Sequence, residues 1–328
     1  MGFFYPEWPN IVRIDVTNPP TTTGYQVIVE IPWQPGMQDG FSDLRFSDYF
    51  RTLPYWIETS TTRSTATVWV KLTEINEAAR EFFCYYGSGG ASSESDGGAV
   101  FDFFDDFLGT SLDTNKWTGD TAYGFVSDSI LTYQTGALPV NRSIRATQNA
   151  YGVNYCIETY AKLHNPSSHC FLGWGDAVWV PLNSVALYAQ TATYLIHQVG
   201  GVYYVEDSNY TKDVYKRWTM GRNGSTNLRF YENGVELSRS PITSNFPTNN
   251  LYAMIEDADE ASTVYVDWLA IRKYQASEPV CTPASYSINT AFYQGYLRAK
   301  GLITAAAGIT LTAIQHLTHI DLSWSEVG

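Results

Sequence analysis

The sequence predicts an all-β protein: two tandem β-sandwiches followed by a β-rich C-terminal tail. Short segments rich in Val, Ile, Phe, Tyr and Trp recur along the chain between turn residues, as strands do. Helical periodicity is almost absent between about residues 100 and 275. A Gly/Ser-rich segment, GSGGASSESDGG, has the composition of a flexible linker. We therefore expect a small N-terminal sandwich at 1–96, a larger sandwich at 97–278 and a tail at 279–328.

The first unit contains a series of short alternating segments. IVRIDV and YQVIVEI alternate apolar and polar residues, with a Pro- and Thr-rich turn between them. LRFSD, LPYWIE, ATVWVKL and EFFCYYG follow at the spacing of about 8–12 residues that is typical of a sandwich.

The second unit is bounded by two segments that we expect to meet in space. FDFFDDFLGTSLDTNKW opens it at Phe101–Trp117, and VYVDWLAIRKY closes it at Val264–Tyr274. Both read as strands, and pairing them would close the sandwich. Between them, RWTMGRNGSTNLRFYENGVEL predicts strands joined by turns, with a tight hairpin at Asn233–Gly234.

The composition limits the classes of partner. Hydrophobic residues make up 44% and aromatic residues 15%, which is enough for a packed core. Charged residues reach 16%, against about 25% in typical soluble proteins, so the surface is polar but weakly charged. The net charge of −13 and the absence of a basic stripe argue against nucleic acid and anionic membrane surfaces, but not against divalent cations. No segment approaches the ~20 apolar residues of a membrane span, so no membrane insertion is expected.

The N-terminus and the cysteines bear on the compartment. MGFFYPEWPNIVRIDV lacks the basic and apolar segments of a secretory signal, so we expect either a trimmed leader or assembly in the cytoplasm. Cys84, Cys156, Cys170 and Cys281 are too few for a disulfide scaffold and form no CxxC pair. Buried free thiols are the favoured interpretation, and disulfides stay open as the alternative.

Two families resemble parts of this chain. The order FSDLRFSD, LPYWIE, TATVWVKL, FFCYYG, then a Ser/Gly tract and FDFFDDF, resembles domain-of-unknown-function family 2341 over roughly residues 10–95. That resemblance implies a small β-sandwich placed before a concanavalin-like domain. DDFLGTSLDTNKW and VDWLAIRKY are similar to the first and last strands of concanavalin A-like jelly rolls, which include laminin-G-like modules and family-16-type glycosidases. The second unit is therefore expected to be a jelly roll.

The second resemblance implies a structural Ca²⁺ site. In such jelly rolls the ion often lies where the first and last strands meet, and the matching positions here are Asp106 and Asp267. Calcium takes about six to eight oxygen ligands, so two carboxylates can anchor a site that carbonyls and waters complete. The alternative is that both aspartates accept hydrogen bonds from the backbone at strand ends.

Catalytic spacing is not evident in the sequence. Family-16-type enzymes carry acidic residues at alternate positions of one strand, spaced E-x-D-x-E or with one residue more. The acidic cluster of this chain, Glu256-Asp257-Ala258-Asp259-Glu260, has an Asp in the wrong phase and precedes the final strand. We interpret it as a solvated acidic turn. No serine-nucleophile elbow or phosphate-binding loop is present either, so no catalytic residue is assigned and the chain is predicted not to be an enzyme.

Aromatic side chains are the candidates for sugar recognition, because a pyranose presents an apolar face that stacks on a ring. FLGWGDAVWVPLNSVALY contributes Trp174, Trp179 and Tyr188, and GGVYYVEDSNY adds Tyr203 and Tyr204. We expect these strands to line a concave sheet. Alternation sends Tyr203 and Tyr204 to opposite faces, so Tyr203 is the one chosen. For each ring, packing in the core is the alternative.

These observations predict a non-enzymatic structural or adhesion protein on a virion surface, such as a spike, fibre or capsid-decorating protein. Its jelly roll would bind a host-surface glycan, and its tail would dock on the sandwich or on a symmetry partner. Other particle proteins and copies of the chain, most simply in a trimer, are the expected partners. A secreted or cell-surface carbohydrate-binding module is the alternative, and a glycoside hydrolase is a third hypothesis.

Overall fold

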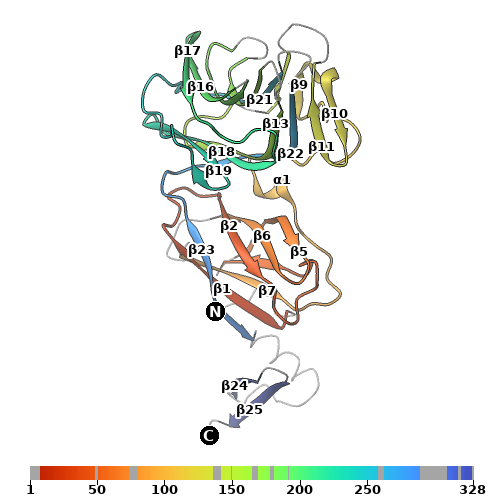
Figure 1. Cartoon of the computed structure of the whole chain (residues 1–328). Coiled ribbons are helices and arrows are strands. Elements are labelled where there is room, and N and C mark those ends of the chain that lie inside the picture. The colour runs from red at the N-terminus through yellow and green to blue at the C-terminus, as the bar shows by residue number, and fades with distance from the viewer. Residues whose placement is uncertain are drawn as a thin grey trace. The chain divides into compact units, whose positions relative to one another are not determined.

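The computed structural model consists almost entirely of strands and divides into two compact units (Figure 1). The first unit contains Met1–Val100 and Glu278–Gly328, and the second contains Phe101–Ser277. The residues described are 8–48, 51–73, 80–135, 142–148, 150–164, 169–177, 181–190, 192–257, 262–288, 309–316 and 319–326. The predicted all-β fold of sandwiches is confirmed.

The first unit is a sandwich of two antiparallel sheets. One has the strand order β23-β1-β7-β3-β4 and the other β2-β6-β5. Their bounds are β1 (Asn10–Thr17), β2 (Tyr25–Pro32), β3 (Arg45–Ser47), β4 (Thr52–Leu53), β5 (Tyr55–Thr61), β6 (Thr65–Leu72), β7 (Glu81–Tyr86) and β23 (Val280–Ile288). Alternate residues such as Val12 and Ile14 on β1, and Val27 and Val29 on β2, face one buried core.

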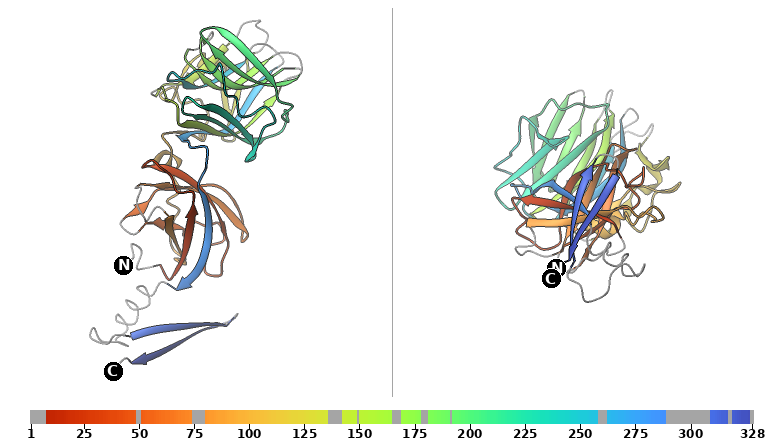
Figure 2. Two further views of the ribbon diagram at one scale, coloured as in Figure 1. Left: turned by 90° about the vertical axis from the view of Figure 1, so that its left-hand side faces the viewer. Right: turned by 90° about the horizontal axis from the view of Figure 1, so that it is seen from below.

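Part of the C-terminal segment belongs to the first sandwich. β23 (blue) runs beside β1 (red) in the first sandwich (Figure 2). The pairing is antiparallel, from Thr17 opposite Val280 to Asn10 opposite Ile288. Further along the chain, β24 (Ile309–His316) and β25 (His319–Glu326) form a two-stranded antiparallel sheet.

The Gly/Ser-rich segment is bonded to the first sandwich, which corrects the expectation of a flexible linker. Its carbonyl groups accept hydrogen bonds from Gln38, which donates to Ser88 at 2.9 Å and to Ala91 at 2.8 Å. Arg45 donates to the carbonyl of Ser92 at 2.9 Å. The segment ends in the short helix α1 (Gly97–Val100). Its composition could not reveal these bonds, because the donors lie on distant parts of the chain.

The second unit is a larger two-layer sandwich. An eight-stranded sheet has the order β10-β11-β22-β13-β18-β19-β20, with β8 also paired to β22, and a seven-stranded sheet has the order β17-β16-β15-β14-β21-β12-β9. The bounds of the first sheet are β8 (Phe103–Asp105), β10 (Gly124–Ser127), β11 (Ile130–Tyr133), β13 (Tyr155–His164), β18 (Lys216–Asn223), β19 (Asn227–Glu232), β20 (Val235–Glu236) and β22 (Thr263–Lys273). Those of the second are β9 (Trp117–Gly119), β12 (Arg142–Ala146), β14 (Cys170–Gly175), β15 (Ser184–Ala189), β16 (Thr193–Val199), β17 (Val202–Asp207) and β21 (Tyr252–Asp257). A short 3₁₀ helix, η2 (Thr121–Tyr123), lies between β9 and β10.

The opening and closing segments of this unit pair as predicted. Asp105 of β8 lies opposite Leu269 of β22, and Phe103 lies opposite Ile271. The opening motif is held by the buried carboxylate of Asp105, which accepts hydrogen bonds from Trp117 Nε1 at 2.7 Å and from the amide of Phe107 at 3.1 Å. The sequence DDF…NKW therefore joins β8 to the start of β9 through one acidic side chain.

The core between the two sheets takes every second residue of the central strands. On β14 the inward residues include Cys170, Leu172 and Trp174. Trp174 is fully buried and donates a hydrogen bond from Nε1 to the carbonyl of Met220 at 3.0 Å. Its predicted role in ligand binding is therefore corrected, because its position on the pleat faces the core rather than the solvent.

The cysteines are free thiols, as the favoured interpretation had it. Cys84, Cys156 and Cys170 are buried, and Cys281 is partly buried. Within the part of the chain that the structure describes, no helix has the length and apolar character needed to cross a membrane.

Candidate functional site

The outer face of the seven-stranded sheet, meaning the face that points away from the core, carries a row of large side chains. The strand register places Glu256 of β21 opposite Phe171 of β14, Phe171 opposite Tyr188 of β15, and Tyr188 opposite Tyr194 of β16. Directly opposed residues in an antiparallel sheet have Cβ atoms about 5 Å apart. One carboxyl group and three rings therefore lie side by side across four strands.

The next row on the same face is made of smaller residues. Met254, Gly173, Ala186, Ile196 and Val205 follow one another across the sheet. A Cβ atom added to Gly173 would lie 2.2 Å from the carbonyl oxygen of Val185, so no larger residue fits there. Because its side chains are shorter than the rings, this second row leaves space above the sheet beside the first row.

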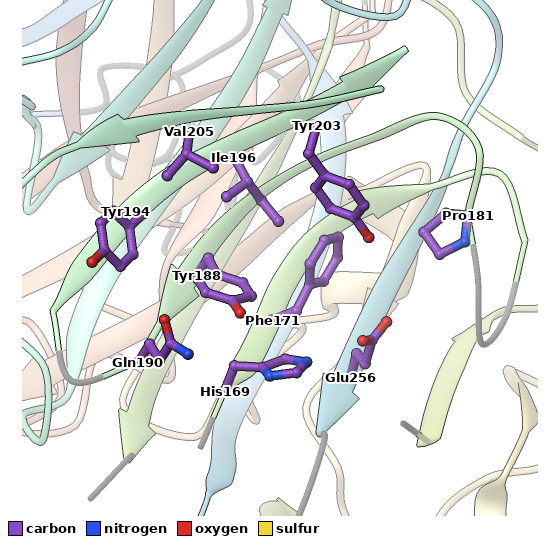
Figure 3. Close-up of a pocket in the computed structure, with 10 residues that line it drawn as sticks. All are labelled: His169, Phe171, Pro181, Tyr188, Gln190, Tyr194, Ile196, Tyr203, Val205 and Glu256. Carbon is purple, nitrogen blue, oxygen red and sulfur yellow. The ribbon is translucent and has the colours of Figure 1, made fainter. Parts of the chain in front are cut away.

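The two rows help to form a pocket of about 500 Å³. Figure 3 shows its lining residues, which come from several strands of this sheet and from the adjoining loops. They are His169, Phe171, Pro181, Tyr188, Gln190, Tyr194, Ile196, Tyr203, Val205 and Glu256. The volume is in the range of small-molecule sites, and the lining combines rings with a few polar groups.

Glu256 is the carboxyl group of this lining, and its environment keeps it protonated. The residue is 6% exposed. Burial, and secondarily the negative charge of Asp257, raises the pKa of Glu256 to about 8. Asp257 points the other way, where its carboxylate accepts hydrogen bonds from the amide and the hydroxyl of Thr135 at 2.7 and 2.9 Å and from the hydroxyl of Ser262. At neutral pH, Glu256 is therefore mostly an uncharged acid that can donate a proton.

The tyrosines of the pocket are neutral hydrogen-bonding groups. Burial raises the pKa of Tyr188 to about 12 and also raises the pKa of Tyr203. The ring of Tyr188 stacks on the imidazole of His169, with ring centroids 5.3 Å apart and an interplanar angle of 23°. This stacking orients His169 beside the row of rings.

Two of the predicted ligand-binding residues line the pocket. Tyr188 and Tyr203 both contribute their rings, and ligand binding by them stays a prediction. Tyr204 lies on the opposite face, stacked on His197 at 5.2 Å between centroids, as the alternation indicated. Trp174 lies in the core, and Trp179 lies outside the described residues.

Phe171 and Glu256 line the pocket although neither was predicted to do so, and the interpretation of Glu256–Asp257 as part of a solvated turn is wrong. Both acidic residues end β21, and both are buried. The alternation in YAMIED could have shown that Glu256 shares a face with Met254. Asp259 and Glu260, which belonged to the same predicted cluster, lie outside the described residues.

The two predicted calcium ligands lie close to one another. Asp267 occupies a β-bulge, because Tyr160 pairs with Trp268 while Ala161 pairs with Val266. Burial, and secondarily the negative charge of Asp106, raises the pKa of Asp267. Among the described residues, no cluster of three or more His, Cys, Asp or Glu side chains has the arrangement of a metal site. Any ion bound here would therefore need backbone carbonyls and waters as further ligands.

A protein-family model matches part of the chain. The model for Domain of unknown function (DUF2341) matches residues 40–120, which confirms the resemblance drawn from the sequence. The match runs from the first unit into the opening motif of the second. No curated protein matches the chain.

Solved structures that resemble the chain are named for enzymes that act on glycans. A structure from work on endo-acting O-glycanases of the human gut microbiota has 13% identity and a TM-score of 0.43, and covers 53% of this chain and 100% of its own. A β-agarase A in complex with oligoagarose has 14% identity and a TM-score of 0.44, with coverages of 55% and 91%. A β-1,3-glucanase from Mycobacterium marinum has 13% identity and a TM-score of 0.42, with coverages of 52% and 98%.

These findings correct two predictions made from the sequence. The three structures are named for enzymes that act on glycans, and the comparisons give no support to the predicted virion-associated structural or adhesion protein or to the prediction that the chain is not an enzyme. The missing catalytic spacing in one short acidic segment was one of the observations behind both predictions. Tertiary structure places an acid of that segment, Glu256, beside rings from other strands.

Proposed function

We propose that the unit Phe101–Ser277 is a carbohydrate-active domain that binds a glycan across the outer face of its seven-stranded sheet. The observation that carries the proposal is the row Glu256–Phe171–Tyr188–Tyr194, which borders a pocket of about 500 Å³. Rings stack on the apolar faces of sugars, and the neutral hydroxyl, amide and carboxyl groups around them suit sugar hydroxyls.

A second step of the proposal concerns cleavage of the glycan. Glu256 is protonated at neutral pH and lies within a lining of rings, which is the setting of a general acid. In the proposed step, Glu256 gives its proton to the glycosidic oxygen as the bond from that oxygen to the anomeric carbon breaks. Water then adds its oxygen to the anomeric carbon, and a proton of that water returns to the Glu256 carboxylate. The net reaction is hydrolysis, with one water consumed for each bond cleaved.

The experiment tests binding and cleavage separately with a panel of soluble polysaccharides. Isothermal titration calorimetry measures binding, and the release of reducing ends measures cleavage. We expect Tyr188→Ala to weaken binding at least roughly tenfold through loss of ring stacking. We expect Glu256→Gln to keep binding and to lose cleavage, because an amide has no acidic proton to give.

The matched control is Tyr160→Ala. Tyr160 is 36% exposed and lies on the other sheet, so the change removes a tyrosine ring far from the row of rings in sequence and register. It should leave both measurements unchanged. Binding that survives Tyr188→Ala would contradict the assignment of the pocket. Binding without cleavage by the unaltered protein would contradict the role of Glu256 and leave a carbohydrate-binding module.

We also propose that Asp106 and Asp267 anchor a structural Ca²⁺. The support is that Asp267 lies at the bulge, where burial and then the negative charge of Asp106 raise its pKa, and a divalent cation beside both carboxyl groups would offset that charge. Neither side chain is needed by the opening motif, because the neighbouring Asp105 accepts the hydrogen bonds that hold that motif together. The location expected from the sequence, a virion surface with an extracellular or cell surface as the alternative, and assembly as a trimer stay predictions.

A further inference from the structure

Arg145 and Tyr252 form a second feature of the same outer face. Arg145 of β12 lies opposite Met254 of β21, and Ser143, two residues earlier, lies opposite Glu256. Arg145 is therefore a diagonal neighbour of the acid that lines the pocket. Tyr252 begins β21 and lies opposite Gly175 of β14.

The guanidinium group of Arg145 lies over the ring of Tyr252. Its central carbon is 3.9 Å from the centroid of the Tyr252 ring, and both residues are half-buried. A guanidinium group over a ring keeps its charge and the N–H donors at its edge. The ring thus orients the cation without neutralising it.

Arg145 differs in this from three other arginines of the unit. Arg142 lies 3.6 Å from the carboxylate of Asp120, Arg229 lies 2.9 Å from that of Glu236, and Arg272 lies 2.6 Å from that of Glu158. Among the described residues, no ion pair or hydrogen bond joins the Arg145 side chain to a carboxylate. Its donors are available to a bound molecule.

The spacing along β21 relates this cation to the pocket. Tyr252 precedes Glu256 by four residues on one strand, which corresponds to about 14 Å at ~3.4 Å per residue. Residues of equal parity share one face of a strand, so both side chains lie on the outer face. A glycan chain that leaves the pocket at Glu256 in the direction of β12 would reach Arg145 on the same face.

We propose that Arg145 and Tyr252 form a subsite for an anionic group, a carboxylate or sulfate, on the glycan that occupies the Glu256 pocket. This inference relies on the proposed function of the pocket. The planar fork of a guanidinium group matches both anions through paired hydrogen bonds. The net charge of −13 gives the protein as a whole no attraction for anions, so a preference for an acidic glycan has to come from a local cation.

The experiment uses the whole chain and matched pairs of glycans that differ only in charge. One pair is polygalacturonate and its methyl ester, and the other is a sulfated galactan and its desulfated form. Calorimetry should show that the acidic member of at least one pair binds roughly tenfold more tightly, as expected for a charge-assisted contact. The pair that shows the preference identifies the anion.

Three variants test whether Arg145 causes the preference. Arg145→Gln should reduce it at least roughly fivefold, and Arg145→Lys should restore only part of it because a point charge replaces the planar fork. Lys162→Gln is the matched control, because Lys162 also lies over a tyrosine ring, 4.0 Å from the centroid of Tyr265, but on the other sheet. It should leave the preference unchanged.

The outcomes separate this inference from the proposed function. Equal binding of both members of each pair, with binding still weakened in Tyr188→Ala, overturns the subsite and leaves the pocket in place. A preference that persists in Arg145→Gln also overturns the subsite. If no glycan binds to the folded protein, the proposed function fails and the subsite fails with it.

Discussion

The carboxylate of Asp257 accepts two hydrogen bonds from Thr135, from the backbone amide at 2.7 Å and from the side-chain hydroxyl at 2.9 Å. These bonds hold a buried negative charge next to Glu256 in the chain. That charge is the second cause, after burial, of the raised pKa of Glu256. The acid of the pocket is therefore tuned by a residue that points to the opposite side of the sheet.

The first prediction follows from this arrangement. Replacing Asp257 with Asn removes the neighbouring charge, so we expect the pKa of Glu256 to fall from about 8 while burial still keeps it above its ordinary value of 4.5. Carboxyl ¹³C chemical shifts of glutamate-labelled protein, followed across pH, measure the change. An unchanged pKa in folded Asp257→Asn would show that the charge of Asp257 has no influence on Glu256.

The second prediction concerns stability and pH. The folded pKa of about 8 exceeds the ordinary value of 4.5, so between these values the folded state holds a proton that the unfolded chain has released. The contribution of Glu256 to stability is therefore fully present below about pH 4.5, falls as the pH rises toward 8, and levels off above that pH. We expect Glu256→Gln to remove this fall. Thermal melts of both proteins across this range measure it.

Asp128→Asn is the control for those melts, because Asp128 lies on an exposed turn. The control should follow the pH dependence of the unaltered protein. Parallel curves for Glu256→Gln and the unaltered protein would mean that Glu256 ionises normally in the folded state.

The third prediction concerns the opening motif. Asp105 accepts hydrogen bonds from Trp117 Nε1 at 2.7 Å and from Lys116 Nζ at 3.1 Å, and it is 4% exposed. Asp105→Ala leaves buried donors without an acceptor, and we expect a loss of about 3 kcal/mol in the free energy of unfolding. Chemical denaturation followed by tryptophan fluorescence measures the loss. Asp106→Ala in the presence of chelator is the matched control and should lose less than about 1 kcal/mol.

The fourth prediction concerns the proposed calcium site. Chelation by EDTA should lower the melting temperature, and added Ca²⁺ should restore it, because an ion that binds only the folded state stabilises that state. Asp267→Asn should abolish the response to Ca²⁺, since an amide is a weaker ligand than a carboxylate. A melting temperature that does not change in chelator would contradict the site.

Much of the fold could be read from the sequence because it depends on local alternation and on the two ends of the second unit. The pairing of β8 with β22 followed from two strand-like segments that needed partners, and the structure contains it. The facing of single residues was harder to predict. Trp174 is predicted from the sequence to bind a ligand. In the structure it shares a face of β14 with Leu172, and both side chains lie in the core.

The pocket could be predicted only in part for a physical reason. Tyr188 and Tyr203 could be named from the sequence because each is an aromatic residue within a short strand-like segment. Glu256 was missed because its partners, Phe171 and Tyr188, come from strands far away in the sequence.

The sequence by itself determined that this chain is built of strands, that it contains two sandwiches and that its surface is weakly charged, because strand periodicity and composition are properties of short segments. The tertiary structure alone decided which side chains share the outer face and how burial protonates Glu256. It also placed Arg145, which has no carboxylate partner among the described residues, diagonally opposite that acid. Those properties depend on strand register and on burial, which arise only when distant segments pack together.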